Sequence, residues 1–423
     1  MWKSVKIVGP VLLLLLVAVV VIRFTGIWDS INRNDSKANK ITDSASTAIQ
    51  ANNMNGTSTN GNTANQENSS NKTSYNQENS AISKRLEQNL KSKESTETPK
   101  QQALSIIAVG DILLGRGVEY HINRVQGDFT YPFRQVVDVL RQGDIVFANL
   151  EGPLTESTNS LDPNGKIVLK SPEKAAEGIK YAGINVLNLA NNHIMDYYEQ
   201  GLLDTINILD KHGIAYTGAG KNIEEARKPA IIEKNGLKIA VISYTDMAEY
   251  TFKGNPMLSF AADENKSGVA PRKYELIKED IDAIREEVDI LIVSLHWGVE
   301  NSFNVTEEQI EFAHQLIDDG VDIILGHHPH RFQGVEIYNG KPIVYSLGNF
   351  IFDQNDPNNQ ESFIVSMKFK EKKLSFMQLI PVRTIDKNHV IIPKGDEAIE
   401  MLKRELELCG KLGSKCAIVN DTI

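Results

Sequence analysis

From about residue 105 onward, apolar residues fall in short runs that alternate with amphipathic stretches. The runs are almost continuously apolar and rich in Val and Ile, which is typical of strands covered on both faces. They occupy residues 105–110, 144–149, 184–190, 238–244, 288–297 and 322–326. The stretches between them show helical spacing of apolar positions and occupy residues 172–181, 198–212, 272–287 and 306–319. This alternation predicts an α/β domain.

After Gly326 the pattern changes to consecutive strands. These strands are predicted at residues 334–339, 342–347, 362–369 and 374–384, and a closing helix is predicted at 397–408. Asn339 and Gly340 separate the first two strands, and this dipeptide favours a two-residue hairpin. The whole pattern predicts a mixed sheet, or two stacked sheets flanked by helices.

The amino terminus has the pattern of a membrane anchor. Residues 7–22 are uncharged and mostly Leu and Val, and Lys3 and Lys6 precede them. We expect residues 1–28 to form a single-pass signal-anchor helix, with the carboxyl-terminal domain outside the cell membrane according to the positive-inside rule. A cleaved signal peptide is the alternative, but no small-x-small cleavage site follows the apolar run.

Residues 29–104 have a composition that does not support a packed core. Ten of the thirty residues from 51 to 80 are Asn, and most of the others are Ser, Thr, Gln and Gly. Such a segment has too little apolar surface to offset its ordering entropy. We therefore predict a disordered linker at 29–104 and one folded domain at 105–423.

Charge and cysteine content exclude several classes of protein. The chain has a net charge of −10; residues 1–104 carry 12 basic and 8 acidic side chains, so the rest of the chain has a net charge of −14. This charge argues against a nucleic-acid partner, because such proteins need a surplus of Lys and Arg. Two cysteines exclude a disulfide scaffold and a Cys-rich zinc module. Cys409 and Cys416 form either one disulfide or two free thiols.

Side chains that bind metals follow the predicted strands directly. In open α/β sheets, sites form where the carboxyl ends of the strands meet. These strand ends supply Asp111, Glu151, Asn192, His193, His296, His327, His328 and His330. Five of the nine histidines thus lie at strand ends; we interpret the others, His121, His212, His314 and His389, as structural or exposed.

The types of ligand indicate which metal would bind. Carboxylate, amide and imidazole groups without thiolates favour Mn, Fe, Zn or Mg. The five to seven candidate ligands are more than one tetrahedral zinc ion needs, so one or two divalent ions are expected. Two ions bridged by a carboxylate would suit attack on a phosphoester, with a nearby His protonating the leaving group.

Six motifs together resemble one known family. They are Gly110-Asp111-Ile-Leu-Leu-Gly115-Arg116, Asn149-Leu-Glu151-Gly-Pro, Leu189-Ala-Asn-Asn-His193-Ile-Met-Asp196-Tyr197, His296-Trp-Gly-Val-Glu300, Gly326-His-His-Pro-His330 and Ser346-Leu-Gly-Asn-Phe350. In this order, across residues 105–384, they resemble the poly-γ-glutamate capsule-synthesis (CapA-type) family. The resemblance implies a four-layered αββα sandwich similar to that of the calcineurin-like metallophosphoesterases.

The resemblance also implies roles for individual residues. The positions that match metal ligands are Asp111, Glu151, Asn192, His296, His328 and His330. His193 matches the catalytic proton donor. Leu113 stands where those phosphoesterases have a histidine, which leaves open whether one metal or two are bound. Arg116, further along, would instead hold an anionic group by a bidentate contact.

Further residues are expected to orient the ligands or to contact substrate. They are Arg116, Asn191, Asp196, His327 and Asn349. Asn349 and Asp353 would lie beside the histidines and fix the orientation of their rings. The alternative for this segment is a strand end at which Gly348 makes a turn and the two phenylalanines pack.

Three functions follow as hypotheses. The first is a membrane-anchored protein of poly-γ-glutamate capsule or extracellular polymer synthesis or export, working with other membrane components and an anionic polymer. The second is a metal-dependent hydrolase that acts on a phosphoester at the cell surface. The third is a binding protein that holds its ligand through the metal without turnover. Leu113 in place of a metal ligand favours the first and third hypotheses over the second.

Overall fold

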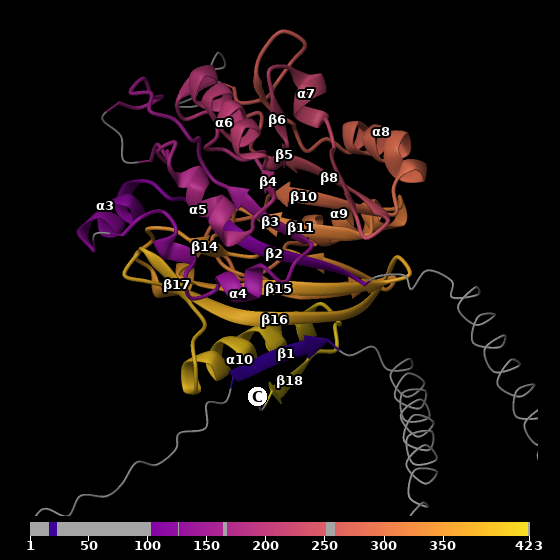
Figure 1. Ribbon diagram of the computed structural model, residues 1–423. Helices are drawn as coiled ribbons and strands as arrows, with labels where there is room; N and C mark the ends of the chain where they lie inside the picture. Colours follow the sequence, from indigo (N-terminus) through magenta and orange to yellow (C-terminus); the bar gives the residue numbers. More distant parts are fainter. Residues whose placement is uncertain (1–16, 23–102, 126, 164–166, 251–258, 422–423) are drawn as a thin grey trace, which may run out of the picture. The chain divides into compact units, whose positions relative to one another are not determined.

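The computed structural model describes residues 17–22, 103–125, 127–163, 167–250 and 259–421 (Figure 1). They form a mixed α/β fold rich in sheet, as the sequence predicts. The predicted linker at 29–104 lies outside the described residues except for its last two, and the chain already enters a strand at Leu104.

The first sheet has ten strands. Its order is β18-β1-β16-β15-β2-β3-β4-β5, with β14 beside β2 and β17 beside β16. Strands β2 to β5 are parallel, whereas β15 runs antiparallel to β2. The bounds are β1 (Val17–Ile22), β2 (Leu104–Ile112), β3 (Ile145–Leu150), β4 (Val186–Asn188), β5 (Ala215–Thr217), β14 (Asn349–Ile351), β15 (Glu361–Lys370), β16 (Lys373–Ile385), β17 (His389–Ile391) and β18 (Ala417–Asp421).

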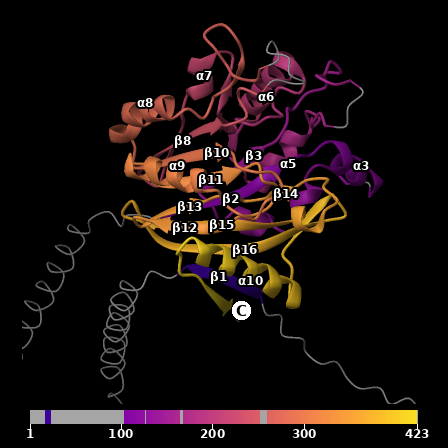
Figure 2. The ribbon, with the colours of Figure 1, turned by 180° about the vertical axis from the view of Figure 1, so that it is seen from behind.

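The second sheet has six strands in the order β12-β13-β11-β10-β8-β7, visible from behind in Figure 2. Strands β8, β10, β11 and β13 are parallel. Their bounds are β7 (Ala230–Lys234), β8 (Leu237–Thr245), β10 (Ile290–His296), β11 (Ile323–His327), β12 (Val335–Tyr338) and β13 (Lys341–Val344). A separate pair consists of β6 (Ala219–Gly220) and β9 (Gly268–Val269).

The two sheets pack face to face. One buried core joins Ile106 and Phe147 of the first sheet to Val241 and Ile292 of the second. Two further cores lie on the outer faces, where helices cover each sheet. The helices on the first sheet are α3 (Arg116–Arg124), α4 (Val137–Leu140), α5 (Ala175–Ala182) and α6 (Tyr198–His212), and those on the second are α7 (Ile223–Arg227), α8 (Tyr274–Ile284) and α9 (Glu307–Asp318).

The remaining helices are short or lie at the end of the chain. Helix α10 (Asp396–Lys411) supplies Met401 and Leu402 to the core between the sheets. The 3-10 turns among the described residues are η1 (Tyr131–Phe133), η4 (Arg285–Glu287) and η5 (Pro357–Asn359).

The predicted hairpin is present between β12 and β13. Asn339 and Gly340 both adopt positive φ, at 51° and 77°. This left-handed pair matches the right-handed twist of the two strands that it joins. Helix α6 has the predicted bounds, whereas α3 and the edge strand β7 were not predicted.

The amino-terminal prediction is described only at residues 17–22. They form β1, antiparallel to β16 and β18, so over these six residues the structure differs from the predicted helix. Five of the six residues in the run Val-Ala-Val-Val-Val-Ile are β-branched, which suits a strand that pairs with β16. Within the described residues, no helix has the length and apolarity needed to cross a bilayer. The membrane location stays a prediction.

The two cysteines near the carboxyl terminus are free thiols in the structure. Cys409 is buried on α10, and its thiol donates a hydrogen bond to Glu405 Oε1 at 3.2 Å. The predicted alternatives of a disulfide and two thiols are thus resolved in favour of two thiols.

Candidate metal centre

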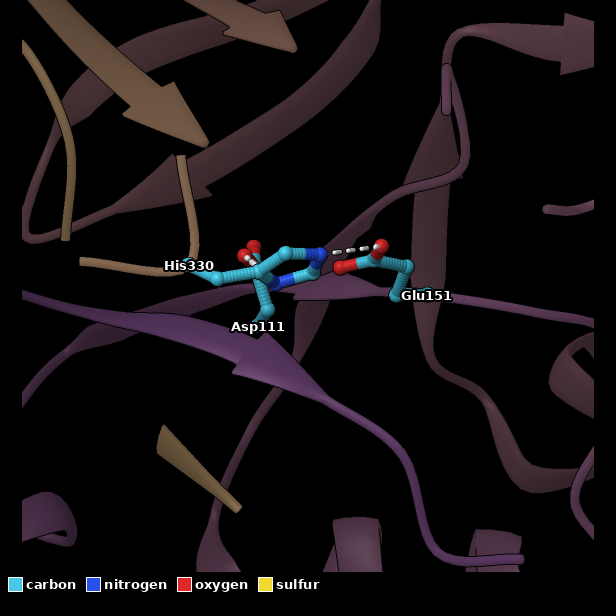
Figure 3. Close-up of side chains that lie close together, drawn as sticks. All are labelled: Asp111, Glu151 and His330. Atoms are coloured by element: carbon cyan, nitrogen blue, oxygen red, sulfur yellow. Dashed lines mark ion pairs between the residues drawn. The ribbon is translucent and has the colours of Figure 1, made fainter. Parts of the chain in front are cut away.

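The carboxyl ends of β2, β3 and β11 meet at a buried group of three side chains. Asp111 lies in β2, Glu151 directly follows β3, and His330 follows β11. Each offers a ligand atom, and these atoms all lie within 4.8 Å of one another. Figure 3 shows the His330 ring facing Glu151, with ion-pair lines from the ring to both carboxylates.

Three of the four carboxylate oxygens of this group have no hydrogen-bond partner among the described residues. His330 Nδ1 lies 3.6 Å from Asp111 Oδ2, and His330 Nε2 lies 3.6 Å from Glu151 Oε1. Asp111 Oδ2 and both carboxylate oxygens of Glu151 are buried, without a hydrogen-bond partner among the described residues. Buried charged oxygens are costly unless a cation compensates them. A divalent ion held by these two carboxylates and the imidazole fits this need and this set of donors.

The pKa values of the three groups show the same demand for positive charge. Burial raises the pKa of Glu151 to about 7, against the opposing charge of His330. Burial raises the pKa of Asp111, but the hydrogen-bonded His327 and the nearby charge of His330 outweigh it, so this pKa lies well below its usual range. Burial lowers the pKa of His330, but the charges of Glu151 and Asp111 raise it by more, so this pKa is about 10. A protonated His330 thus supplies the positive charge that a divalent ion would supply more strongly.

Three other predicted ligands adjoin this group. His296 Nε2 lies 2.8 Å from Asn192 Oδ1 and 3.2 Å from His328 Nδ1. The rings of His328 and His330 have centroids 6.3 Å apart. Burial lowers the pKa of His296 well below its usual range and that of His328 to about 4. Both imidazoles are therefore neutral at physiological pH, which is the form that binds metals.

Buried amides and one more histidine hold Asp111 in place. Asn149 Nδ2 donates to Asp111 Oδ1 at 2.9 Å, and Asn188 and Asn191 donate to Asn149 Oδ1 at 2.9 and 3.2 Å. His327 Nδ1 lies 3.0 Å from Asp111 Oδ1. The sequence reasoning placed His327 and Asn191 here but missed Asn149 and Asn188. The one feature of the sequence that marks these two residues is an amide side chain within an otherwise apolar strand.

Asn349 contacts His330 as the sequence predicts for a residue that orients the ring. Its Oδ1 lies 2.9 Å from His330 Nδ1, and its Nδ2 donates to the carbonyl of Asn359 at 2.9 Å. The amide is thus fixed on one side by the backbone and turned toward the imidazole on the other. This contact directs the Nε2 atom of His330 toward Glu151.

His193, the predicted proton donor, pairs with Asp196. The His193 Nδ1 atom lies 2.8 Å from Asp196 Oδ2, which also accepts a hydrogen bond from the Leu169 backbone at 2.6 Å. Burial lowers the pKa of His193, but the charge of Asp196 and then that of Glu151 raise it above the ordinary value. The side chain is 20% exposed, so the imidazole of His193 reaches the surface.

Arg116 and Asp353 differ from the prediction. Asp353 does not pair with the histidines; it takes the guanidinium of Arg116 in a bidentate contact, with Nε–Oδ2 at 3.1 Å and Nη2–Oδ1 at 2.7 Å. Gly117 N also donates to Asp353 Oδ2 at 3.1 Å. Gly115 precedes α3 and has no side chain that could cap its first turn. Asp353 instead accepts the hydrogen bond from the backbone N–H of Gly117 in that turn. The anionic group that Arg116 holds by a bidentate contact is therefore a side chain of the protein itself, Asp353.

Comparison with known proteins identifies the family. Residues 105–354 match the family described as bacterial capsule synthesis protein PGA_cap. This chain belongs to the PGA_cap family. It is 34% identical over 316 residues to PGA biosynthesis protein CapA of Bacillus subtilis (strain 168), covering 73% of this chain and 80% of that protein. It is 32% identical over 288 residues to capsule biosynthesis protein CapA of Bacillus anthracis, covering 67% and 68%.

A more distant similarity connects this PGA_cap chain to an enzyme. It is 26% identical over 238 residues to a 5′-nucleotidase of Diplobatis ommata, covering 53% of this chain and 36% of that protein. The segment that matches the PGA_cap family begins at β2 and ends just after Asp353. It contains every candidate site residue, whereas β15 to β18 and α10 follow it.

Proposed function

We propose that this protein is a metal-dependent component of poly-γ-glutamate capsule synthesis or export that works at the outer face of the cell membrane. Membership of the PGA_cap family supports the process, as do the two relatives named CapA. The lysine-flanked apolar run at residues 7–22 supports the location. Other membrane components of the assembly would be its partners, and an anionic polymer would be its ligand.

The observation that carries the metal dependence is that three buried carboxylate oxygens, Asp111 Oδ2 and both of Glu151, have no hydrogen-bond partner among the described residues. Asp111, Glu151 and His330 would hold one divalent ion, Mn, Fe, Zn or Mg. Asn192, His296 and His328 would hold a second ion. A bound ion would supply Lewis-acid polarisation of an anionic group. Leu113 leaves the first ion with one protein ligand fewer than metallophosphoesterases have.

We further propose that the two facing sheets and their outer helices form the four-layered αββα sandwich of the metallophosphoesterase type. The similarity to the 5′-nucleotidase supports this assignment, and so do the metal-binding side chains at the ends of strands from both sheets. The protein residues would keep their own tasks in such a site. Asn349 would orient the ring of His330, and Asp196 would orient the ring of His193 and raise its pKa.

Deletion of the gene and complementation test the proposal. We expect the deletion strain to lose extracellular poly-γ-glutamate, and the wild-type gene to restore it. Asp111→Asn, which removes a buried carboxylate charge, should not restore the polymer and should lower the divalent metal content of the purified full-length protein. Asp138→Asn, at an exposed position on α4, is the matched control and should behave as wild type. Normal polymer output from the Asp111→Asn strain, at equal protein abundance, would contradict the proposal.

A second candidate function is hydrolysis of a phosphoester at the cell surface. The pairing of His193 with Asp196 beside Glu151 favours it, because a protonated imidazole can protonate a leaving group. Purified full-length protein with Mn²⁺ should then hydrolyse a generic phosphoester. His193→Gln should lower turnover by about 10²-fold or more while metal content stays unchanged. Metal binding without turnover, for any divalent ion tried, would leave a binding role in place of hydrolysis.

A further inference from the structure

A pocket of about 610 Å³ lies next to the segments that hold Asp196 against His193. Its lining includes Arg116, Thr158, Ser160, Lys170 and Tyr197. The volume lies within the range of small-molecule and cofactor sites in proteins. The pocket is separate from the group of Asp111, Glu151 and His330, none of which lines it.

Two short backbone segments both line the pocket and position Asp196, the partner of His193. Tyr197 directly follows Asp196, the residue that pairs with His193. Lys170 directly follows Leu169, whose backbone N–H donates to Asp196 at 2.6 Å. Lys170 and Tyr197 line the pocket, whereas Asp196 pairs with the imidazole of His193. A ligand in the pocket therefore contacts residues that directly adjoin the segments that position His193.

The chemistry of the lining favours an anion. Both charged residues of the lining, Arg116 and Lys170, are cations, and hydroxyl groups come from Thr158, Ser160 and Tyr197. Asp353 forms a close ion pair with Arg116, whereas Glu119 acts on Lys170 only through its charge, so Lys170 is the more available cation. Outside residues 1–104 the chain has a net charge of −14, so its general field repels polyanions. An acidic ligand therefore needs a local cation such as Lys170.

Lys170 is held in position and still has donors to offer. Its Nζ donates to the carbonyl of Ser157 at 2.7 Å and lies 5.0 Å from the centroid of the Tyr197 ring. An ammonium group has three donors, and this contact uses one of them. The remaining N–H groups can meet an oxygen anion in the pocket with little further ordering of the side chain.

We propose that this pocket binds an anionic group, carboxylate or phosphate, of the ligand that the neighbouring metal centre acts on, with Lys170 as the charged contact. This inference rests on the proposed function, whose ligand is an acidic polymer or a phosphoester. The pocket would hold one acidic group of the ligand, while another part of the same ligand reaches His193.

Binding measurements on the full-length protein in the presence of Mn²⁺ test the inference. One arm uses a γ-linked glutamate pentamer as the probe, and the other uses phenyl phosphate. Loss of one charge-assisted hydrogen bond predicts that Lys170→Gln weakens binding of the true class of probe about tenfold. Lys170→Arg, which keeps the charge, should bind within about threefold of wild type. Lys403→Gln, at an exposed position on α10, is the matched control and should not change binding.

The arms separate the possible outcomes. A Lys170-dependent loss with the pentamer assigns the pocket to carboxylates, and the same loss with phenyl phosphate assigns it to phosphates. Equal affinity of Lys170→Gln and wild type, or no binding of either probe to wild type, overturns the inference. If Lys170→Gln lowers the melting temperature, Thr158→Glu replaces it, since this exposed position brings negative charge into the same pocket and should also weaken binding. Metal content is measured on every sample, so a wild-type protein without metal contradicts the proposed function, while the comparison at Lys170 still decides the pocket.

Discussion

At the scale of single residues, the candidate metal centre depends on an amide row, Asn149 in β3 and Asn188 in β4, that leads to Asp111 in β2. Asp111 in β2 is in register with Asn149 in β3, which is in register with Asn188 in β4. Each amide donates to its neighbour in the direction of Asp111. The row uses one carboxylate oxygen of Asp111 and leaves the other, Oδ2, directed at His330.

Asn149→Ala should therefore destabilise the protein. The change removes a donor from Asp111 and an acceptor from Asn188 and Asn191, all of them buried. We expect the free energy of unfolding to fall by about 1–3 kcal/mol, measured by urea denaturation. Asn265→Ala, at an exposed position, should change it by less than about 0.5 kcal/mol. Equal stability of both variants would show that the amide row does not hold Asp111.

The sequence predicted part of this residue-scale picture. Asp111, Glu151 and His330 directly follow or end apolar runs, and parallel strands bring their carboxyl ends to one edge, so their proximity was foreseeable. Asn149 lies within a strand, where an amide has no spacing signature. The contact of Arg116 with Asp353 joins residues 237 positions apart in sequence, and the need of α3 for an acceptor decides it. The roles of Asp111, Glu151 and His330 as metal ligands, and of His193 as proton donor, stay predictions.

At the scale of elements, α10 carries a buried carboxyl group far from the metal centre in sequence. Glu405 is fully buried, and its Oε2 lacks a hydrogen-bond partner among the described residues. Burial raises the pKa of Glu405 well above its usual value, against the opposing hydrogen bond from Cys409. The folded protein therefore favours the protonated carboxyl, whereas the unfolded chain ionises near pH 4.3.

The sign of the resulting pH dependence follows from linkage. Below about pH 4 both states hold the proton, and Glu405 adds no pH dependence. As the pH rises, the unfolded state releases the proton first, so the stability of the wild type falls. Glu405→Gln cannot ionise and should be more stable than wild type at pH 8, with a difference that shrinks toward pH 4 in urea denaturation. Glu407→Gln, exposed on the same helix, should show no such trend; a Glu405→Gln variant less stable at pH 8 would contradict this account.

The hairpin between β12 and β13 offers a second element-scale test. A Cβ at Gly340 would meet nothing within 4 Å, so Gly340→Ala would lose only the conformational freedom that φ of +77° requires. We expect a loss of about 1 kcal/mol in the free energy of unfolding. Gly410 on α10 is equally open but helical, and Gly410→Ala should gain about 0.5 kcal/mol. The two variants should thus shift the thermal midpoint in opposite directions; a shift in the same direction would count against the left-handed turn.

Helices and strands differ in how well the sequence predicted them. The helix at 198–212 was predicted with its bounds, because fifteen residues of regular apolar spacing end at Gly213. Strand β7 was missed because it is an edge strand with one buried residue, Ala230, and exposed neighbours. Helix α3 was missed because only Val118 and Ile122 are buried, so its apolar face is too narrow to show a period.

At the scale of the whole molecule, the candidate ligands come from both sheets. Asp111 and Glu151 belong to β2 and the end of β3 in the first sheet, whereas His296 and His330 belong to β10 and the segment after β11 in the second. The apolar core between the sheets brings these ends together. A bound ion would thus connect the sheets at one edge and compensate the buried carboxylates there.

Removal of divalent metal should therefore lower the stability of the whole domain. An ion that binds only the folded state stabilises it by about 2.7 kcal/mol at a concentration one hundred times its dissociation constant. We expect a chelator to lower the thermal midpoint of the wild type and Mn²⁺ to restore it. In Glu151→Gln, one buried carboxylate charge is absent, so the metal-free protein should melt no lower than metal-free wild type, and Mn²⁺ should raise its midpoint much less. Identical responses of the two proteins to chelator and Mn²⁺ would show that the ion does not bind where the sheets meet.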